Sequence, residues 1–222
     1  MKRMMLARPA LFVLVAAILL LAGCGTSPPS RFYALKAVKV QESTGQVTTA
    51  AQTVLLAVGP IQIPDYLNRP QIVTLTAQNQ LAINEFERWG GSLRDDIDQA
   101  LTENLAAQLT SEGVAVVSWR GPVPGAYRVP VEVNRFDAVP GGSVELKAMW
   151  GISTSDGTKI LLVSGSTITQ PVNDKDYSAV VAAMSRSIGT LSQEIAAGVK
   201  SLLAAGSMKA LGTPGLDSGK TK

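Results

Sequence analysis

Cys24 is the only cysteine of this 222-residue chain, and the chain contains no histidine. The missing histidines exclude Ser-His and Cys-His nucleophilic sites and any histidine-rich metal site. No glycine-rich phosphate loop follows a predicted strand. With a single cysteine, no disulfide can form within the chain. Cys24 is therefore a candidate for covalent modification and not for a disulfide within the chain.

Two pairs of acidic residues are the remaining candidates for catalysis, because paired carboxylates can act as general acid and base. Asp95-Asp96 and Asp174/Asp176 both fall where we expect a helix to begin. The helix dipole favours negative charge there, which favours a helix-stabilising role. The alternative, a carboxylate-pair hydrolase, requires a cleft that the sequence does not reveal. We therefore predict a protein that is not an enzyme and that holds no metal or cofactor.

The residues before Cys24 form a targeting segment. The first eight residues include three basic ones and no acidic one, and Ala10 to Ala22 is an apolar run of 13 residues. As a helix this run is roughly 20 Å long, whereas a bilayer core is about 30 Å thick. The pattern is typical of a cleaved signal peptide, residues 1–23. The alternative is an uncleaved membrane helix, which the polar residues after Cys24 disfavour.

The four residues that end at Cys24, Leu-Ala-Gly-Cys, resemble the lipobox of bacterial lipoproteins. This resemblance implies that Cys24 becomes the first residue of the mature protein and carries covalently attached lipid. Several acyl chains hold a protein stably on a membrane, whereas one chain does so only marginally. In lipoproteins an Asp after the cysteine favours the inner membrane, and Gly25 stands there instead. We therefore predict an outer-membrane lipoprotein facing the periplasm, with the inner membrane as the alternative.

A short tether separates Cys24 from the folded part of the chain. Residues 24–30 are small, polar or proline, and the stretch from Gly25 to Ser30 spans roughly 20 Å when extended. The folded domain must therefore lie close to the membrane surface. Beyond residue 23 the chain has 17 basic and 17 acidic residues, so no basic excess favours binding to nucleic acid.

Alternating apolar residues predict several strands. Two long runs alternate at 127–136 and 144–152, and Asp156-Gly157 predicts a hairpin that leads into 158–168. Shorter strands are expected at 31–40, 53–58, 71–76, 80–86 and 114–119. Pro130 should place its strand at an edge or at a bulge. Hairpins separated by helices favour an α+β fold, in which two amphipathic helices pack on a mostly antiparallel sheet in a single domain.

Two segments have the periodicity of amphipathic helices. The first begins at Ser92, whose side chain is expected to cap it, and its apolar face consists of Leu93, Ile97, Ala100, Leu101, Leu105 and Leu109. The second begins near Asn173-Asp174, with the apolar series Tyr177, Val181, Met184, Ile188, Leu191, Ile195, Gly198 and Leu202. This series also fits a coiled coil, but the scarcity of flanking charge pairs favours packing on the sheet. We predict a domain over 31–205 and a disordered tail over 206–222.

A proline-bracketed loop carries the most specific pattern in the chain. Residues 64–73 read Pro-Asp-Tyr-Leu-Asn-Arg-Pro-Gln-Ile-Val, residues 87–91 read Glu-Arg-Trp-Gly-Gly, and residues 30–35 read Ser-Arg-Phe-Tyr-Ala-Leu. Together these strings resemble the ABC-type transport auxiliary lipoprotein family, typified by paraquat-inducible protein C (PqiC). The resemblance runs from about Cys24 to the end of the second helix.

The resemblance implies no catalytic activity and an association with a transporter that moves lipid or other hydrophobic compounds across the envelope. The implied partners are a cytoplasmic ATPase, an inner-membrane permease and a periplasmic protein of the mammalian cell entry (MCE) type. A homo-oligomer is a further expectation. The alternative function is a cell-wall-binding or hydrolase-regulating lipoprotein that acts independently of transport. Neighbouring genes, for transporter subunits or for murein enzymes, would distinguish the two.

Four residues in and near the loop are the candidate interface: Tyr66, Leu67, Arg69 and Trp89. Tyr, Trp and Arg are enriched at binding hot spots, and a rigid loop lowers the ordering cost of binding. The alternative is that the three large apolar or aromatic side chains cover the core, while Arg69 pairs with Asp65 or Glu87.

Overall fold

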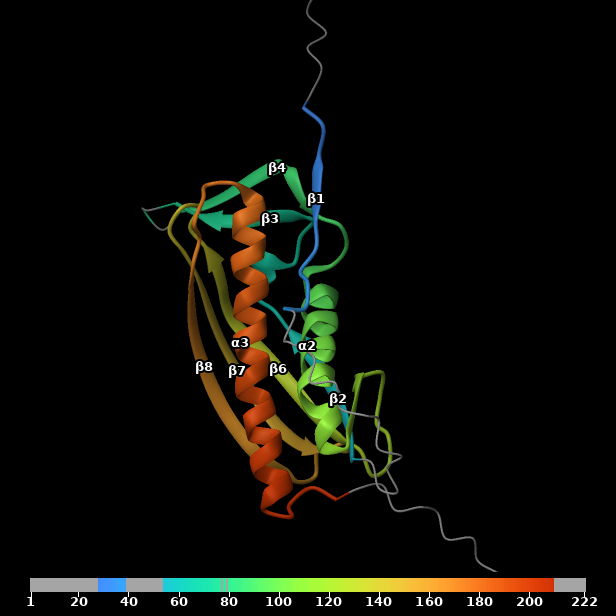
Figure 1. Ribbon diagram of the computed structural model, residues 1–222. Coiled ribbons are helices and arrows are strands. Elements are labelled where there is room, and N and C mark those ends of the chain that lie inside the picture. The colour runs from blue at the N-terminus through green and yellow to red at the C-terminus, as the bar shows by residue number, and fades with distance from the viewer. Residues whose placement is uncertain (1–27, 39–53, 77, 79, 210–222) are drawn as a thin grey trace, which may run out of the picture. The chain divides into compact units, whose positions relative to one another are not determined.

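The helices and strands that the structure describes belong to one unit, which begins at Arg31. The computed structural model describes residues 28–38, 54–76, 78 and 80–209, and Figure 1 shows how its elements are arranged. The signal peptide predicted at 1–23, the lipidation residue Cys24, most of the tether and most of the tail lie outside the described residues.

The larger sheet has five strands in the order β5-β2-β6-β7-β8. Their bounds are Val114–Ser118 for β5, Val54–Gln62 for β2, Tyr127–Ala138 for β6, Ser143–Thr154 for β7 and Ile160–Pro171 for β8. The consecutive strands β6, β7 and β8 pair antiparallel. In contrast, β2 is parallel to both of its neighbours, β5 and β6.

A smaller sheet of three strands has the order β1-β4-β3. These strands are Arg31–Tyr33, Leu81–Trp89 and Gln71–Leu75, respectively. The hairpin predicted from 71 to 86 is confirmed as the antiparallel pair β3 and β4. The first strand is much shorter than the predicted range of 31–40, and it pairs parallel to β4 at the edge of the sheet. A 3-10 turn, η1 (Asp65–Leu67), precedes β3.

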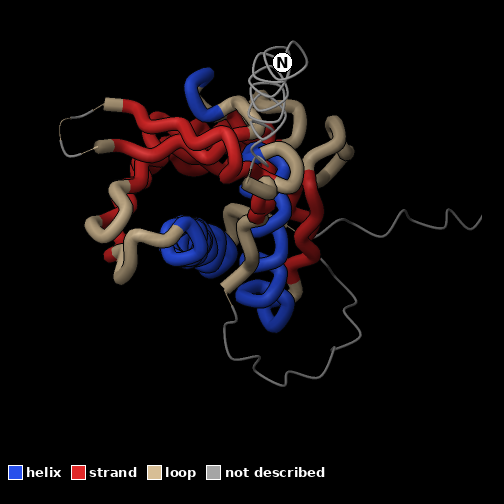
Figure 2. The backbone as a smooth tube through the Cα atoms, turned by 90° about the horizontal axis from the view of Figure 1, so that it is seen from above, coloured by secondary structure: helices blue, strands red, loops and turns tan. Residues whose placement is uncertain are grey.

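Two helices cover one face of the larger sheet (Figures 1 and 2). The first is α2 (Leu93–Leu109), followed by the 3-10 turn η2 (Thr110–Glu112), and the second is α3 (Tyr177–Ala204). They lie side by side, with α2 over β2 and β5 and α3 over β7 and β8. Both begin at the end where the small sheet lies (Figure 1). The starts of the two helices and the first strand of the domain therefore meet in one region.

The apolar patterns of the sequence correspond to the buried faces of these elements. The inward-facing residues of β7 are all buried: Val144, Leu146, Ala148, Trp150 and Ile152. The predicted face of α2 is buried throughout, and the series on α3 packs against the sheet, with its two ends half-buried. The prediction that this second helix packs on the sheet, and not in a coiled coil, is confirmed.

The α+β fold with two helices is confirmed, and both of its sheets are mixed. The parallel pair β2 and β5 arises because β3, β4 and α2 lie between them in the chain, so that the chain returns in the same direction. Parallel strands need such a crossover, whereas hairpins give antiparallel neighbours. Alternation of apolar residues identifies a strand and its hairpin partner, but it does not identify a partner that is distant in sequence.

Pro130 lies in the central strand β6, at the level of a bulge in its neighbour. The register between β2 and β6 shifts between Val58 and Ile61, where β2 passes Pro130. Proline has no N–H to donate to the hydrogen-bond ladder of a sheet. Within a sheet it is therefore tolerated where the strand pairing is irregular, as at a bulge. Of the two alternatives, edge or bulge, the bulge is found.

Two element ends differ from the sequence-based expectation. Ser92 is the N-cap residue of α2, but its side chain makes no capping hydrogen bond. The described chain continues beyond the expected boundary at 205. Met208 is buried, and the backbone N–H of Lys209 donates to the Tyr127 hydroxyl at 2.8 Å. The folded part therefore includes the first residues of the segment predicted as a tail.

Candidate functional site

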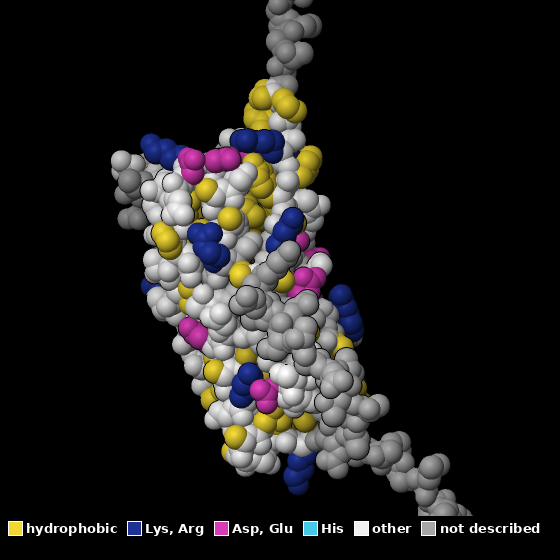
Figure 3. All heavy atoms as spheres, in the orientation of Figure 1, with side chains coloured by type: hydrophobic (Ala, Val, Ile, Leu, Met, Phe, Trp, Pro, Cys, Tyr) yellow, Lys and Arg dark blue, Asp and Glu magenta, His cyan; other side chains and the backbone are white. Residues whose placement is uncertain are grey.

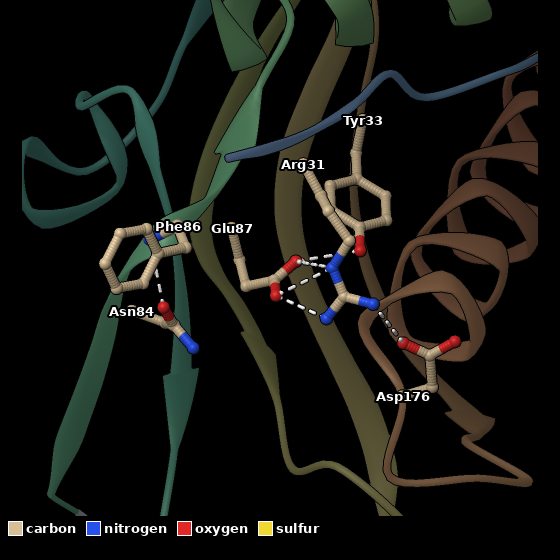
Figure 4. Close-up of polar contacts among 6 residues, drawn as sticks. All are labelled: Arg31, Tyr33, Asn84, Phe86, Glu87 and Asp176. Atoms are coloured by element: carbon tan, nitrogen blue, oxygen red, sulfur yellow. Dashed lines mark hydrogen bonds and ion pairs between the residues drawn. The ribbon is translucent and has the colours of Figure 1, made fainter. Parts of the chain in front are cut away.

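A buried carboxylate lies where the first strand joins the domain. Glu87 on β4 is only 4% exposed, and a buried charge is costly unless it is paired and hydrogen-bonded. The Nε of Arg31 donates to both carboxylate oxygens, at 3.0 and 3.1 Å, and the Tyr33 hydroxyl donates to one of them at 2.8 Å. The Arg31 Nη2 also donates to Glu87. Figure 4 shows these contacts.

The pairing of β1 with β4 explains this geometry. Arg31 is in register with Glu87, and Tyr33 is in register with Trp89. Because alternate residues of a strand point to the same face, Arg31 and Tyr33 both reach Glu87, and Phe32 between them points to the opposite face. The backbone adds a further link, since the Gly90 N–H donates to the Tyr33 carbonyl at 2.7 Å.

The same arginine reaches the second helix. The Nη1 of Arg31 lies 3.8 Å from Oδ1 of Asp176, which is the N-cap residue of α3. We call the four residues Arg31, Tyr33, Glu87 and Asp176 the Glu87 cluster. The cluster joins the first strand, the middle strand of the small sheet and the start of a helix.

The electrostatics of the cluster keep its donors protonated. The hydrogen bond to Glu87 raises the pKa of the Arg31 guanidinium above its usual value. Burial raises the pKa of the Tyr33 hydroxyl, and the hydrogen bond to Glu87 raises it further. A carboxylate occupied by several donors is poorly placed to act as a base. The arrangement therefore suits the mechanical role of fixing the strand that follows the tether.

Replacing Glu87 by alanine should loosen β1 from the domain. The Tyr33 hydroxyl and the Arg31 guanidinium then lose their shared acceptor, so β1 opens more often. We expect amide exchange of Gly90 to rise on the order of tenfold, because a hydrogen bond to a charged group is among the stronger ones. Hydrogen-exchange mass spectrometry measures this exchange in a peptide that covers 86–92, and it measures the opening of β1 in a peptide that covers 31–38.

Glu85→Ala is the matched control for this change. Glu85 lies on the same strand, is exposed, and accepts a hydrogen bond from Gln71 Nε2 at 2.9 Å. The Glu85→Ala substitution removes the same charge from β4 but removes no contact with β1. Equal exchange at Gly90 in both variants would show that Glu87 does not hold the first strand.

The structure separates the four candidate interface residues. Leu67 and Trp89 are 3% and 4% exposed and belong to the hydrophobic core of the domain. Tyr66 is half-buried, and its hydroxyl donates to Asp137 at 2.6 Å. Burial raises the pKa of the Tyr66 hydroxyl, and this hydrogen bond raises it further. Arg69 is exposed. The accessible part of the loop thus consists of Arg69 and one side of Tyr66, and an interface there stays a prediction.

The alternative ion pair of Arg69 is not found. Within the described ranges, neither Asp65 nor Glu87 forms a salt bridge with Arg69, and Glu87 is occupied by Arg31 instead. The clue that the sequence did offer was the spacing of Arg31 and Tyr33. Two polar-tipped side chains two residues apart share a strand face, and they indicate a common partner on the neighbouring strand.

A shallow groove lies on the face of the larger sheet that the helices leave uncovered. Its volume is about 280 Å³, and its lining includes Pro60, Pro130, Met149, Gly151 and Val163. A Cβ atom at Gly151 on β7 would lie 2.9 Å from the carbonyl oxygen of Leu162 on β8. The two strands can therefore approach each other this closely only if residue 151 is glycine. The sequence did not reveal this groove, because its residues come from four strands.

Within the described ranges, none of the helices combines the length and the hydropathy that a membrane span requires. In the same ranges, no three acidic side chains gather in a way that could hold a metal ion.

A family model described as "ABC-type transport auxiliary lipoprotein component" matches residues 33–196. No curated protein matches the chain. Among solved structures, the chain is similar to an uncharacterized protein, with 19% identity and a TM-score of 0.64 over 78% of this chain and 99% of that one. It is also similar to a Xanthomonas campestris protein of family DUF330, with 15% identity and a TM-score of 0.62 over 80% and 99%. At these identities the two structures support the fold alone.

Proposed function

The chain belongs to the family of ABC-type transport auxiliary lipoprotein components, and from that premise we propose that it is a non-enzymatic, lipid-anchored accessory subunit of an envelope transport system. The system would move lipid or other hydrophobic compounds, and its other subunits would be an MCE-type periplasmic protein, a permease and an ATPase. Cys24 would hold the subunit on the outer membrane, facing the periplasm.

One observation carries the proposal. The family match begins nine residues after Cys24, the cysteine that ends the Leu-Ala-Gly-Cys string. The predicted lipid attachment site therefore lies close in sequence to the transport-auxiliary domain, separated from it by a short tether. The Glu87 cluster supports the same role, because it fixes the strand into which the tether leads. An anchored subunit with a rigid entry strand holds its partners at a set distance from the membrane.

The absence of histidine and the occupied state of Glu87 support a non-catalytic role. Outer-membrane placement is supported by Gly25, where lipoproteins retained at the inner membrane carry Asp.

Co-purification tests the proposal directly. The full-length protein, with an affinity tag after Lys222, is purified from cross-linked envelopes of its own bacterium. We expect enrichment of an MCE-type protein, a permease and an ATPase. The matched control is residues 1–30 fused to an unrelated periplasmic domain, which shares the anchor and lacks the auxiliary domain. Enrichment of murein enzymes in place of transporter subunits would overturn the proposal, and so would equal recovery with the control.

A further inference from the structure

The tether limits how far the first strand can lie from the membrane. Seven Cα steps separate Cys24 from Arg31, so the chain between them spans at most about 25 Å. Pro28 and Pro29 lie within it and restrict its conformations. If Cys24 is lipidated, as the proposed function requires, β1 lies within this distance of the bilayer surface.

The Glu87 cluster determines which side of β1 is free. Arg31 and Tyr33 both turn toward Glu87, so Phe32 between them is held on the opposite face. Its side chain is 67% exposed, although phenylalanine is among the residue types that are most often buried. The cluster thus presents an aromatic ring at a fixed orientation, close to the anchor.

Two more residues share this face. Phe32 is in register with Arg88, and Phe86 precedes Arg88 by two residues on the same strand. Phe86 and Arg88 are half-buried, and in Figure 4 Phe86 and Glu87 project to different sides of β4. We call Phe32, Phe86 and Arg88 the aromatic face. In Figure 3, apolar side chains are visible at the end of the domain where β1 lies.

The chemistry of this face fits the surface of a bilayer. Aromatic rings favour the headgroup level of a membrane, and a guanidinium binds phosphate with directed hydrogen bonds. An apolar contact beside a lipid anchor adds to membrane attachment through buried area. We propose that the aromatic face rests on the membrane that carries the Cys24 lipid, with the Phe32 ring inserted at the headgroup level and Arg88 at the lipid phosphates.

This placement fixes the orientation of the whole domain. Ile160, the first residue of β8, is also 67% exposed. The 12-residue strand β8 extends about 36 Å between its first and last residues, and its last residue precedes the start of α3, beside the Glu87 cluster. Figure 1 shows the β7–β8 turn at the other end of the domain from β1. The proposal therefore places Ile160 in water, far from the membrane, and makes it the matched control for Phe32.

The test uses the full lipidated protein and its single cysteine. A lipidated Cys24 has no free thiol, so Phe32→Cys and Ile160→Cys each introduce one reactive site. Each variant is labelled with the fluorophore NBD and reconstituted into vesicles of phosphatidylethanolamine and phosphatidylglycerol. A fraction of the lipids carries a nitroxide on the headgroup as a quencher. We expect a blue-shifted emission at position 32, and quenching several-fold stronger than at position 160.

Equal quenching at the two positions, or stronger quenching at position 160, would overturn the proposed orientation. Both side chains are well exposed, so both variants should keep the wild-type melting temperature, which circular dichroism verifies. The wild-type protein, treated with the same label, distinguishes a failure of the proposed anchoring from a failure of the proposed orientation. If the wild-type protein takes up the label, Cys24 is not lipidated. That result would contradict both the proposed membrane anchoring and the proposed orientation. If it remains unlabelled while positions 32 and 160 behave alike, only the orientation fails.

Discussion

Replacing Cys24 by alanine should remove the protein from the membrane fraction. The expected product is an unprocessed precursor or a soluble periplasmic form, because the acyl chains on Cys24 are the predicted means of attachment. Two or more chains hold a protein stably, and without them an isolated aromatic face supplies only weak binding. Fractionation of the envelope, with detection of the tagged chain, measures the distribution.

Mass spectrometry of the mature N-terminus provides the direct complement to fractionation. In the wild-type protein the first residue should be Cys24 with the mass of its attached lipid. Thr26→Ala is the matched control, since it changes the tether two residues later and leaves the Leu-Ala-Gly-Cys string intact. An unmodified Cys24 in the membrane fraction would contradict the lipidation hypothesis.

The local parts of the fold could be predicted because short-range periodicity determines them. The face of α2 from Leu93 to Leu109 and the inward series of β7 follow from periods of 3.6 and 2 residues, and both are buried as predicted. The parallel pairs could not be predicted in this way. β2 meets β6 more than 60 residues later in the chain, and no local pattern in either strand identifies its partner.

The candidate site also combines features that the sequence could predict with features that it could not. The loop at 64–73 could be recognised from its residues, but which of its side chains are buried could not. The sequence alone left Glu87 as a partner for Arg69, 18 residues away in the chain, whereas the structure pairs it with Arg31, 56 residues away. The parallel pairing of β1 with β4 brings Arg31 into register with Glu87. Arg69 precedes β3, which pairs with the opposite side of β4, and it is exposed. Ion pairs depend on strand register, which the sequence did not reveal.

The contrast between Trp89 and Arg69 decides whether this region is core or interface. Trp89→Ala removes a large side chain that is 4% exposed within the core. Truncation of a buried aromatic costs about 3–5 kcal/mol of unfolding free energy, which lowers the Tm of a domain of this size by roughly 6–20 °C. Thermal unfolding followed by circular dichroism measures the change. A Tm within experimental error of wild type would show that Trp89 does not support the core.

Arg69→Glu is the matched surface change in the same region, and it should leave the Tm nearly unchanged. Arg69 is exposed, and no ion pair of Arg69 is found in the described part of the chain, so stability has little to lose. If the loop is an interface, the reversed charge disrupts assembly, and sedimentation of the detergent-solubilised full chain detects a smaller species. The physical reason is that a like charge or an unpaired charge at a desolvated contact is costly, while the same charge in water is not. A variant that keeps both the wild-type Tm and the wild-type sedimentation would exclude an interface role for Arg69. The binding surface would then have to lie elsewhere, and the uncovered groove around Met149 and Val163 is the next surface to test.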